Sequence, residues 1–253
     1  MAKRIVVLAG DHDTTINLVH FLERDFEVVK VIIEESVPRF TFLMRRVKKC
    51  GWWSVFGQGL FSIVMMPLLR REGMTRANGI KKEYGLRDAP VDENKIERVV
   101  SVNDAATATA VAASAPDWVI VWGTRILSKN LLSQITVPII NIHVGIVPQY
   151  RGSNGGYWAL YHNDAEHFGT TVHLIDEGID TGGVLAQGTV LPSERDNFAT
   201  YPLLQLGIGL RLLVDVLKQE SLASHSVTAA FSKIWYHPTI WEYCITRLRF
   251  GVK

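Results

Sequence analysis

The sequence predicts an α/β fold in which helices flank an open, mostly parallel sheet. Residues 5–9 form a short apolar run that ends at Gly10, and residues 14–22 then carry apolar side chains at helical spacing. This order of strand, turn and helix is typical of an open parallel sheet. With 253 residues and 47% hydrophobic content, the chain is long enough to bury a substantial core in one large domain.

Further apolar runs predict the other strands and a long helix. Residues 26–33 would form the second strand, and residues 118–122 and 139–144 predict strands that are covered on both faces. Residues 198–218 carry apolar residues at helical spacing, so we expect a long helix packed on the sheet. An open α/β sheet binds ligands at the carboxyl ends of its strands, and we therefore look for a site there.

Residues 36–86 depart from this alternation and predict a helical insertion. Within them, residues 51–69 are mainly apolar and aromatic, and basic clusters lie on both sides. One interpretation is peripheral membrane contact through residues 45–71, because such a stretch can lie on an anionic lipid surface. Our expectation is instead that the insertion packs on its own domain. That expectation buries four large aromatic side chains: Trp52, Trp53, Phe56 and Phe61.

The net charge and the cysteine content argue against some classes of protein. The formal net charge is only +2, which gives no support for nucleic-acid binding. Two cysteines, Cys50 and Cys244, are too few for a disulfide framework and have no metal-ligand spacing. The first apolar run is too short for a secretory signal. We expect a cytoplasmic protein, with peripheral membrane association as the alternative.

Three polar residues form a candidate catalytic set. Asn141 and His143 are two apart on an expected strand, so both side chains point to one face. Asp180 lies in a glycine-rich turn between the strand-like runs 170–175 and 184–187, and this turn can bring the carboxylate to the imidazole. An amide, an imidazole and a carboxylate together meet the needs of acyl transfer.

Three ordered motifs resemble the catalytic domain of the folate-dependent formyltransferases. They are Asn141-Ile142-His143, Pro148-x-x-Arg151-Gly152 and Asp176-x-Gly178-x-Asp180-Thr181-Gly182. The family includes glycinamide ribonucleotide transformylase, methionyl-tRNA formyltransferase and the nucleotide-sugar N-formyltransferases. The resemblance implies a Rossmann-like formyltransferase fold, with a catalytic domain over residues 1–220 and a short extension over residues 221–253. It also implies 10-formyltetrahydrofolate as the formyl donor and no metal.

The resemblance implies a role for each candidate residue. Asn141 and His143 would donate hydrogen bonds to the oxygen that becomes negative when an amine attacks the formyl carbon. Asp180 would favour the protonated form of His143 and could accept the proton of the amine. The residues expected to bind the folate are Trp122, Gly123, Arg125, Ile126, Leu127, Asp176, Glu177 and Gly178.

The acceptor side of the site is less defined. The residues expected to contact the acceptor are Gly10, Arg151, Ser153 and Asn154. The turn at Gly10 could bind a phosphate through backbone amides, but Asp11 and Asp13 would repel it, and helix capping is the alternative. For Arg151 we favour a role in fixing its own loop over contact with a substrate anion.

The expected function is formyl transfer to a primary amine of a small molecule, with a nucleotide-linked amino sugar as the favoured acceptor. The alternatives are glycinamide ribonucleotide as acceptor, hydrolysis of 10-formyltetrahydrofolate, and a non-catalytic folate-binding or membrane-associated module. A nicotinamide oxidoreductase is disfavoured because the dinucleotide fingerprint is missing after the first strand. We expect no nucleic-acid partner, and a homodimer remains one option for the assembly.

Overall fold

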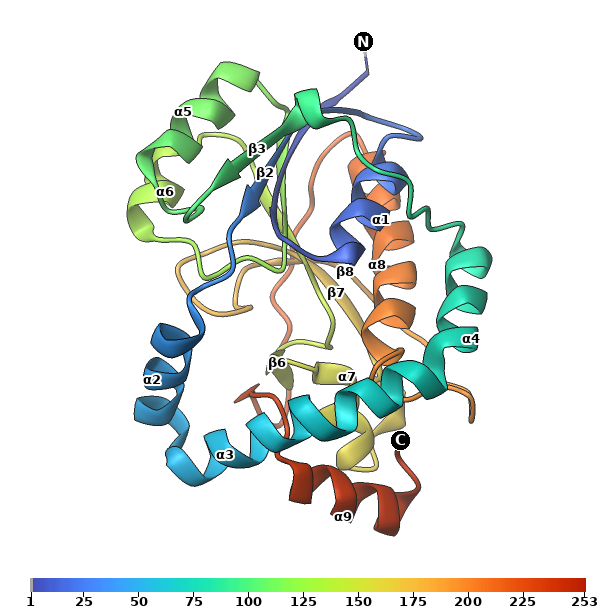
Figure 1. The fold of residues 1–253 in the computed structure, drawn as a ribbon. Helices are drawn as coiled ribbons and strands as arrows, with labels where there is room; N and C mark the ends of the chain where they lie inside the picture. The colour runs from blue at the N-terminus through green and yellow to red at the C-terminus, as the bar shows by residue number, and fades with distance from the viewer. Residues whose placement is uncertain (1) are drawn as a thin grey trace.

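A seven-stranded open sheet forms the centre of the computed structural model, which describes residues 2–253 (Figure 1). Its strand order is β3-β2-β1-β4-β5-β7-β8. The strands are β1 (Arg4–Gly10), β2 (Glu27–Glu34), β3 (Ile96–Val99), β4 (Trp118–Trp122), β5 (Ile139–His143), β7 (Gly169–Leu174) and β8 (Val184–Thr189). The first five pair in parallel, whereas β7 and β8 are antiparallel additions at one edge. The predicted fold class is confirmed.

Helices cover both faces of this sheet (Figure 1). They are α1 (Asp13–Leu22), α5 (Ala105–Ser114), α6 (Lys129–Gln134), α7 (Gly155–Tyr161) and α8 (Tyr201–Leu217), with 3₁₀ turns at Glu93–Lys95 and Ala165–His167. Side chains of β1 alternate between two cores: Val7 packs in the core that includes α1 and α8, and Leu8 packs in the core that includes α5 and α6. This alternation explains why β1 is apolar throughout.

The predicted helical insertion is confirmed. It comprises α2 (Arg39–Cys50), α3 (Trp52–Leu60), a π-helical turn (Phe61–Met65) and α4 (Met66–Tyr84), which together form a band below the carboxyl ends of the strands (Figure 1). Phe61 is fully buried, with its ring 4.9 Å from that of Phe198 and 5.0 Å from that of Tyr243 in α9 (Ile240–Phe250).

The expectation that the other three aromatics of the insertion are buried is wrong. Trp52, Trp53 and Phe56 are 67%, 56% and 51% exposed. The reason is geometric, since a helix turns 3.6 residues per turn and presents only one stripe to the domain. The buried stripe carries Val55 and Phe61, whereas Trp52 and Phe56 lie outside it, and Trp53 stacks on Trp241 but stays exposed.

The C-terminal residues return to the sheet region. Strand β9 (Lys233–Trp235) pairs in parallel with β6 (Tyr150–Gly152), which lies in the connection that follows β5. This two-stranded sheet places residues 234–236 beside the end of β5, where the candidate catalytic residues lie.

Candidate active site

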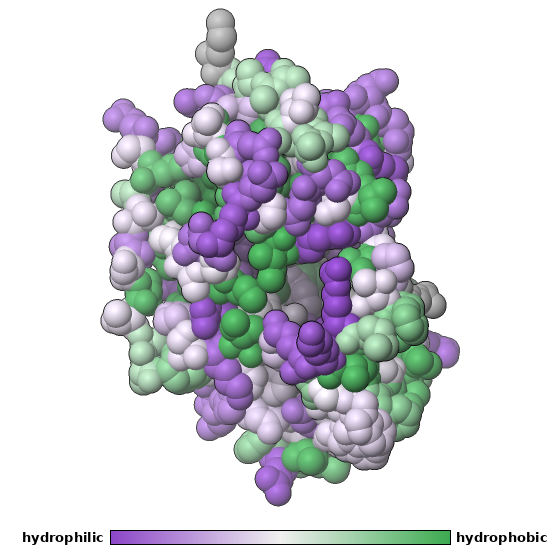
Figure 2. All heavy atoms as spheres, turned by 90° about the vertical axis from the view of Figure 1, so that its left-hand side faces the viewer, coloured by the Kyte–Doolittle hydropathy of each residue, from purple (hydrophilic) through white to green (hydrophobic). Residues whose placement is uncertain are grey.

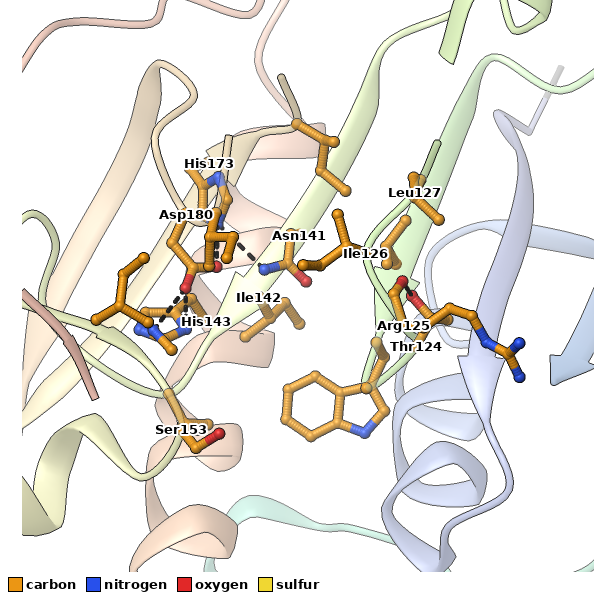
Figure 3. Close-up of a pocket in the computed structure, with 18 of the residues that line it drawn as sticks. Thr124, Arg125, Ile126, Leu127, Asn141, Ile142, His143, Ser153, His173 and Asp180 are labelled. Atoms are coloured by element: carbon orange, nitrogen blue, oxygen red, sulfur yellow. Dashed lines mark hydrogen bonds and ion pairs between the residues drawn. The ribbon is translucent and has the colours of Figure 1, made fainter. Parts of the chain in front are cut away.

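The three candidate catalytic residues meet at the carboxyl end of β5 (Figure 3). Asn141 and His143 project from β5, as their spacing predicts. His143 Nδ1 lies 3.5 Å from Asp180 Oδ2, and His143 Nε2 lies 2.7 Å from the carbonyl oxygen of Tyr150. The imidazole is 5% exposed, so its two nitrogen atoms face a carboxylate and a carbonyl in a largely dry setting.

A second histidine, His173 of β7, completes the cluster. It is the register partner of Asn141 across the antiparallel β5/β7 pair, and the two side chains lie within hydrogen-bond distance, with 3.1 Å between Asn141 Nδ2 and His173 Nε2. His173 Nδ1 is 2.7 Å from the Leu174 carbonyl oxygen, so this nitrogen carries the proton. In the neutral ring Nε2 is then an acceptor, which orients the Asn141 amide and leaves its second N–H for a ligand.

Asp180 is held in place by its backbone conformation and by one hydrogen bond, and two imidazoles lie close to its carboxyl group. It has a left-handed backbone conformation, with φ of +51°, in the turn that follows β7. Its Oδ2 accepts a hydrogen bond of 2.8 Å from the backbone N–H of Gly152, and its Oδ1 lies 3.6 Å from His173 Nε2. Gly152 has φ of +91°, and a Cβ atom there would collide with the carbonyl oxygen of Trp235, so a glycine is required at this position.

The carboxyl group of Asp180 is ionised in this setting. Burial acts to raise its pKa, but the opposing effects of His143, His173 and the Gly152 N–H outweigh burial. The pKa of Asp180 is therefore held well below its usual range. A buried carboxylate beside two imidazoles can stabilise a positive charge on either ring, or it can accept a proton from a ligand.

A pocket of about 470 Å³ lies between this cluster and the segment that follows β4. Figure 3 shows Asn141, His143, His173 and Asp180 on one side and Thr124 to Leu127 on the other. Such a volume suits a small organic ligand. Apolar side chains from strand ends form part of the wall: Val121, Ile142, Ile175 and Leu127.

Most of the residues expected to bind the folate lie in this wall. They are Trp122, Gly123, Arg125, Ile126, Leu127, Asp176 and Gly178. The Arg125 guanidinium points away from the cluster and pairs with Glu34, and its Nη2 donates to the carbonyl oxygens of Glu35 and Val100 (Figure 3). Glu177 lies outside the pocket lining and pairs with Lys129.

Of the residues expected on the acceptor side, Ser153 lines the pocket, whereas Gly10, Arg151 and Asn154 lie outside its lining. A Cβ at Gly10 would lie 2.6 Å from the Gly123 carbonyl oxygen, so this glycine permits close approach of two strand ends. Arg151 Nη1 donates to the Ile179 carbonyl oxygen at 3.3 Å and so braces the turn that carries Asp180. Asn154 is the left-handed residue before α7.

Several pocket residues were not predicted from the sequence. They are His12, Thr14, Lys49, His173, Pro202, Ile234, Trp235 and Tyr236. Lys49 comes from α2, and its Nζ lies 5.2 Å from the ring centroid of Tyr236. The insertion and the C-terminal residues therefore form one wall together; the β6/β9 pairing and a hydrogen bond from Gln58 Nε2 to the His237 carbonyl oxygen hold the C-terminal residues there.

Comparison with known proteins agrees with this geometry. The sequence model of the formyl transferase family, described as "Formyl transferase", matches residues 76–201. The methionyl-tRNA formyltransferase of Chlorobium chlorochromatii is 29% identical over 182 residues, which cover 70% of this chain and 55% of that protein. The chain thus spans little more than half the length of this curated relative.

Solved structures share the fold. Glycinamide ribonucleotide transformylase 1 from Symbiobacterium toebii superposes with a TM-score of 0.54 at 18% identity, covering 85% of each chain. A sugar N-formyltransferase from Shewanella sp. superposes with a TM-score of 0.50 at 15% identity, covering 85% of this chain and 68% of that one. The family model, the curated relative and the shared fold agree, and the chain belongs to the family of folate-dependent formyltransferases.

Proposed function

We propose that the protein transfers a formyl group from 10-formyltetrahydrofolate to a primary amine of a small molecule. The observation that carries this proposal is the convergence of Asn141, His143 and Asp180 on one pocket. The pocket fits a folate by its volume and by the apolar side chains in its lining, which suit a flat ring. When bound, the folate supplies the formyl carbon.

Asn141 and His143 stabilise negative charge on the formyl oxygen. His173 holds one N–H of the Asn141 amide, and the other N–H is available to that oxygen. His143 Nδ1 lies farther from Asp180 than a normal hydrogen bond, at 3.5 Å, so this nitrogen can donate to a substrate oxygen. Loss of one such donor typically costs about 3 kcal/mol in the barrier.

Asp180 has two roles in the proposed reaction, and both depend on its negative charge. As an ionised carboxylate it stabilises a positive imidazole at His143 and can accept the proton that the amine loses as its nitrogen bonds to the formyl carbon. Its low pKa keeps it ionised at neutral pH. Its negative charge is therefore in place before the amine arrives.

For the acceptor we propose an amino sugar linked to a nucleotide. Two features of the wall formed by α2 and the C-terminal residues support it: a half-buried aromatic ring, Tyr236, and a cation beside it, Lys49. An aromatic face suits a nucleobase, and an ammonium group suits a phosphate. The shared fold with a sugar N-formyltransferase is consistent with this choice.

A panel of acceptors tests the proposal. The purified protein is incubated with 10-formyltetrahydrofolate and, separately, with a nucleotide-linked amino sugar, the free amino sugar, glycinamide ribonucleotide and methionyl-tRNA, and formyl gain is read by mass. We expect gain on the nucleotide-linked sugar. Formyl gain on methionyl-tRNA or glycinamide ribonucleotide instead would support formyl transfer but contradict the proposed acceptor. Release of formate without any amine would identify a hydrolase.

A pair of lysine variants tests the acceptor side directly. Lys49→Gln should raise KM for the nucleotide-linked sugar about tenfold, the cost of one lost charge-assisted contact, without raising KM for the free amino sugar. Lys48→Gln is the matched control, because Lys48 is exposed and lies outside the pocket lining. Equal effects of the two variants would remove Lys49 from the acceptor site.

A further inference from the structure

A band of exposed apolar side chains runs along the helical insertion, and we call it the α2–α4 face. Among the side chains that the structure describes, seventeen large apolar ones are exposed, and ten of these lie on the α2–α4 face, so the surface apolarity is concentrated here. They are Phe40, Leu43, Met44, Trp52, Trp53, Phe56, Ile63, Val64, Leu68 and Met74. Contiguous exposed patches of this kind mark interaction sites.

The helix that carries most of this band lies along the domain surface. Residues 52–84 are long and apolar enough to cross a membrane by length and composition. However, Phe61, Leu69 and Ile80 are buried in the main core, and withdrawal of the helix would expose them. Trp53, Phe56, the half-buried Leu60, Val64 and Leu68 follow one another at spacings of three or four, which gives a stripe along the outer side of the helix.

The charge around this stripe has one sign. Residues 39–71 contain seven lysines and arginines and no aspartate or glutamate, although the whole chain has a net charge of only +2. Exposed cations lie at both ends of the apolar stretch: Arg45, Lys48 and Lys49 on α2, and Arg70 and Arg71 on α4. The remainder of the chain is therefore net negative, and the positive charge is concentrated beside the exposed apolar side chains.

This combination favours one occupant over two others. A second copy of the chain would bring two like-charged faces together across a symmetric interface, which opposes dimerisation. A nucleic acid would meet the cations but would leave Ile63 and Leu68, 76% and 58% exposed, without an apolar partner. The head groups and upper acyl chains of an anionic bilayer match both the cations and the apolar side chains.

We propose that the α2–α4 face docks on the surface of an anionic lipid membrane, with the helices in the plane of the interface. The same helix α2 carries Lys49 in the wall of the pocket, so docking brings the pocket to within roughly one helix diameter, about 10 Å, of the head groups. Figure 2 shows the side on which α2 lies, where the surface is hollowed near its middle and hydrophilic residues border the hollow.

Sedimentation with lipid vesicles tests this proposal on the full chain without substrates. Vesicles of phosphatidylcholine with 30% phosphatidylglycerol are compared with pure phosphatidylcholine at low and high salt. We expect binding to the anionic vesicles that weakens strongly at 1 M salt, where surface charges are screened beyond about 3 Å. Equal binding to both vesicles, or none to either, would overturn the proposal.

Two double variants separate the apolar and the charged contributions. Ile63→Ser with Leu68→Ser should weaken binding tenfold or more, roughly, because two exposed aliphatic side chains no longer enter the interface. Arg70→Gln with Arg71→Gln should weaken binding about thirty-fold, at about 1 kcal/mol for each cation. Neither pair belongs to the core, so thermal melting should be unchanged.

Matched controls use exposed residues elsewhere on the chain. Val100→Ser with Leu191→Ser, and Arg87→Gln with Arg195→Gln, should bind as the wild type does. Equal losses in variants and controls would reject the α2–α4 face as the docking surface. A dimer in sedimentation velocity that Ile63→Ser with Leu68→Ser dissociates would assign the face to a second copy of the chain and overturn the proposal.

Discussion

Replacing Asp180 with asparagine should lower kcat by about three orders of magnitude while leaving the protein folded. Asparagine keeps the volume and can still accept the hydrogen bond from the Gly152 N–H. What the variant loses is the negative charge that lies 3.5 Å from His143 and 3.6 Å from His173. The effect on catalysis is thus separable from the effect on packing.

The size of the loss follows from the distance. A unit charge pair 3.5 Å apart interacts by about 5 kcal/mol at an effective dielectric constant of about 20. Removal of a general base alone costs roughly 3–5 kcal/mol, or 10²–10⁴ in rate. These two estimates describe overlapping roles of one carboxylate and are not additive, so we expect about 10³.

The assay is amine-dependent consumption of 10-formyltetrahydrofolate by wild type and variant, with thermal melting measured on the same samples. Asp196→Asn is the control, because Asp196 is also buried and ion-paired, 2.9 Å from Arg76 Nε, but lies outside the pocket lining. It should lower stability and leave kcat near the wild-type value. An Asp180→Asn variant that keeps more than a third of the wild-type kcat would refute the proposed role.

The Asp180→Asn variant should also differ from the wild type in how its stability depends on pH in acid. Because the native pKa of Asp180 is depressed, its carboxylate stabilises the fold at pH values above the unfolded pKa of about 3.9. That contribution is lost as the pH falls through the depressed native pKa. The stability difference between wild type and Asp180→Asn should therefore be constant near neutral pH and shrink below about pH 4 in urea titrations.

Four further changes test the roles of other residues. Asn141→Ala and His143→Ala should each lower kcat at least 10²-fold with folate binding retained, as measured by titration; near-normal turnover in either would remove that residue from the mechanism. His173→Gln should lower kcat about tenfold through misorientation of the Asn141 amide, and an unchanged kcat would limit His173 to packing. Deletion of residues 51–69 should cause aggregation, because it removes Phe61 from the core, and a soluble, cooperatively folded product would contradict the packing described above.

The order of apolar runs predicted most strands of the sheet and the two helices α1 and α8, whereas β3, α5 and α6 were not predicted. Each of the strands β1, β2, β4 and β5 is a short apolar run, and burial on both faces makes such runs visible without an alternating pattern. The shared orientation of Asn141 and His143 could also be predicted, because a spacing of two places both side chains on one face of a strand.

His173 could not be assigned in the same way. Its position opposite Asn141 depends on the register of the antiparallel β5/β7 pair, and the sequence of neither strand alone determines that register. A polar residue on a strand that is otherwise buried was the available signal. Trp235 and Tyr236 reach the pocket through a pairing between residues about 80 positions apart, which no local pattern contains.

The aromatic residues of the insertion show a different limit. Their content predicts burial of large surfaces, but the number of apolar residues exceeds what one helical stripe can bury. Phe61 packs in the core, whereas Trp52 and Trp53 remain exposed. Composition thus identified an apolar segment without deciding which side of it faces the domain.

We propose that formyl transfer to an amine takes place at the site formed by Asn141, His143 and Asp180. It is tested most directly by following a 10-formyltetrahydrofolate that carries an isotopic label in its formyl group, with a nucleotide-linked amino sugar as acceptor, in wild type and Asn141→Ala in parallel. We expect the label to appear on the amine nitrogen in the wild type at a rate at least 10² times that of the variant. Label found only in formate, or transfer at equal rates by the two proteins, would contradict it.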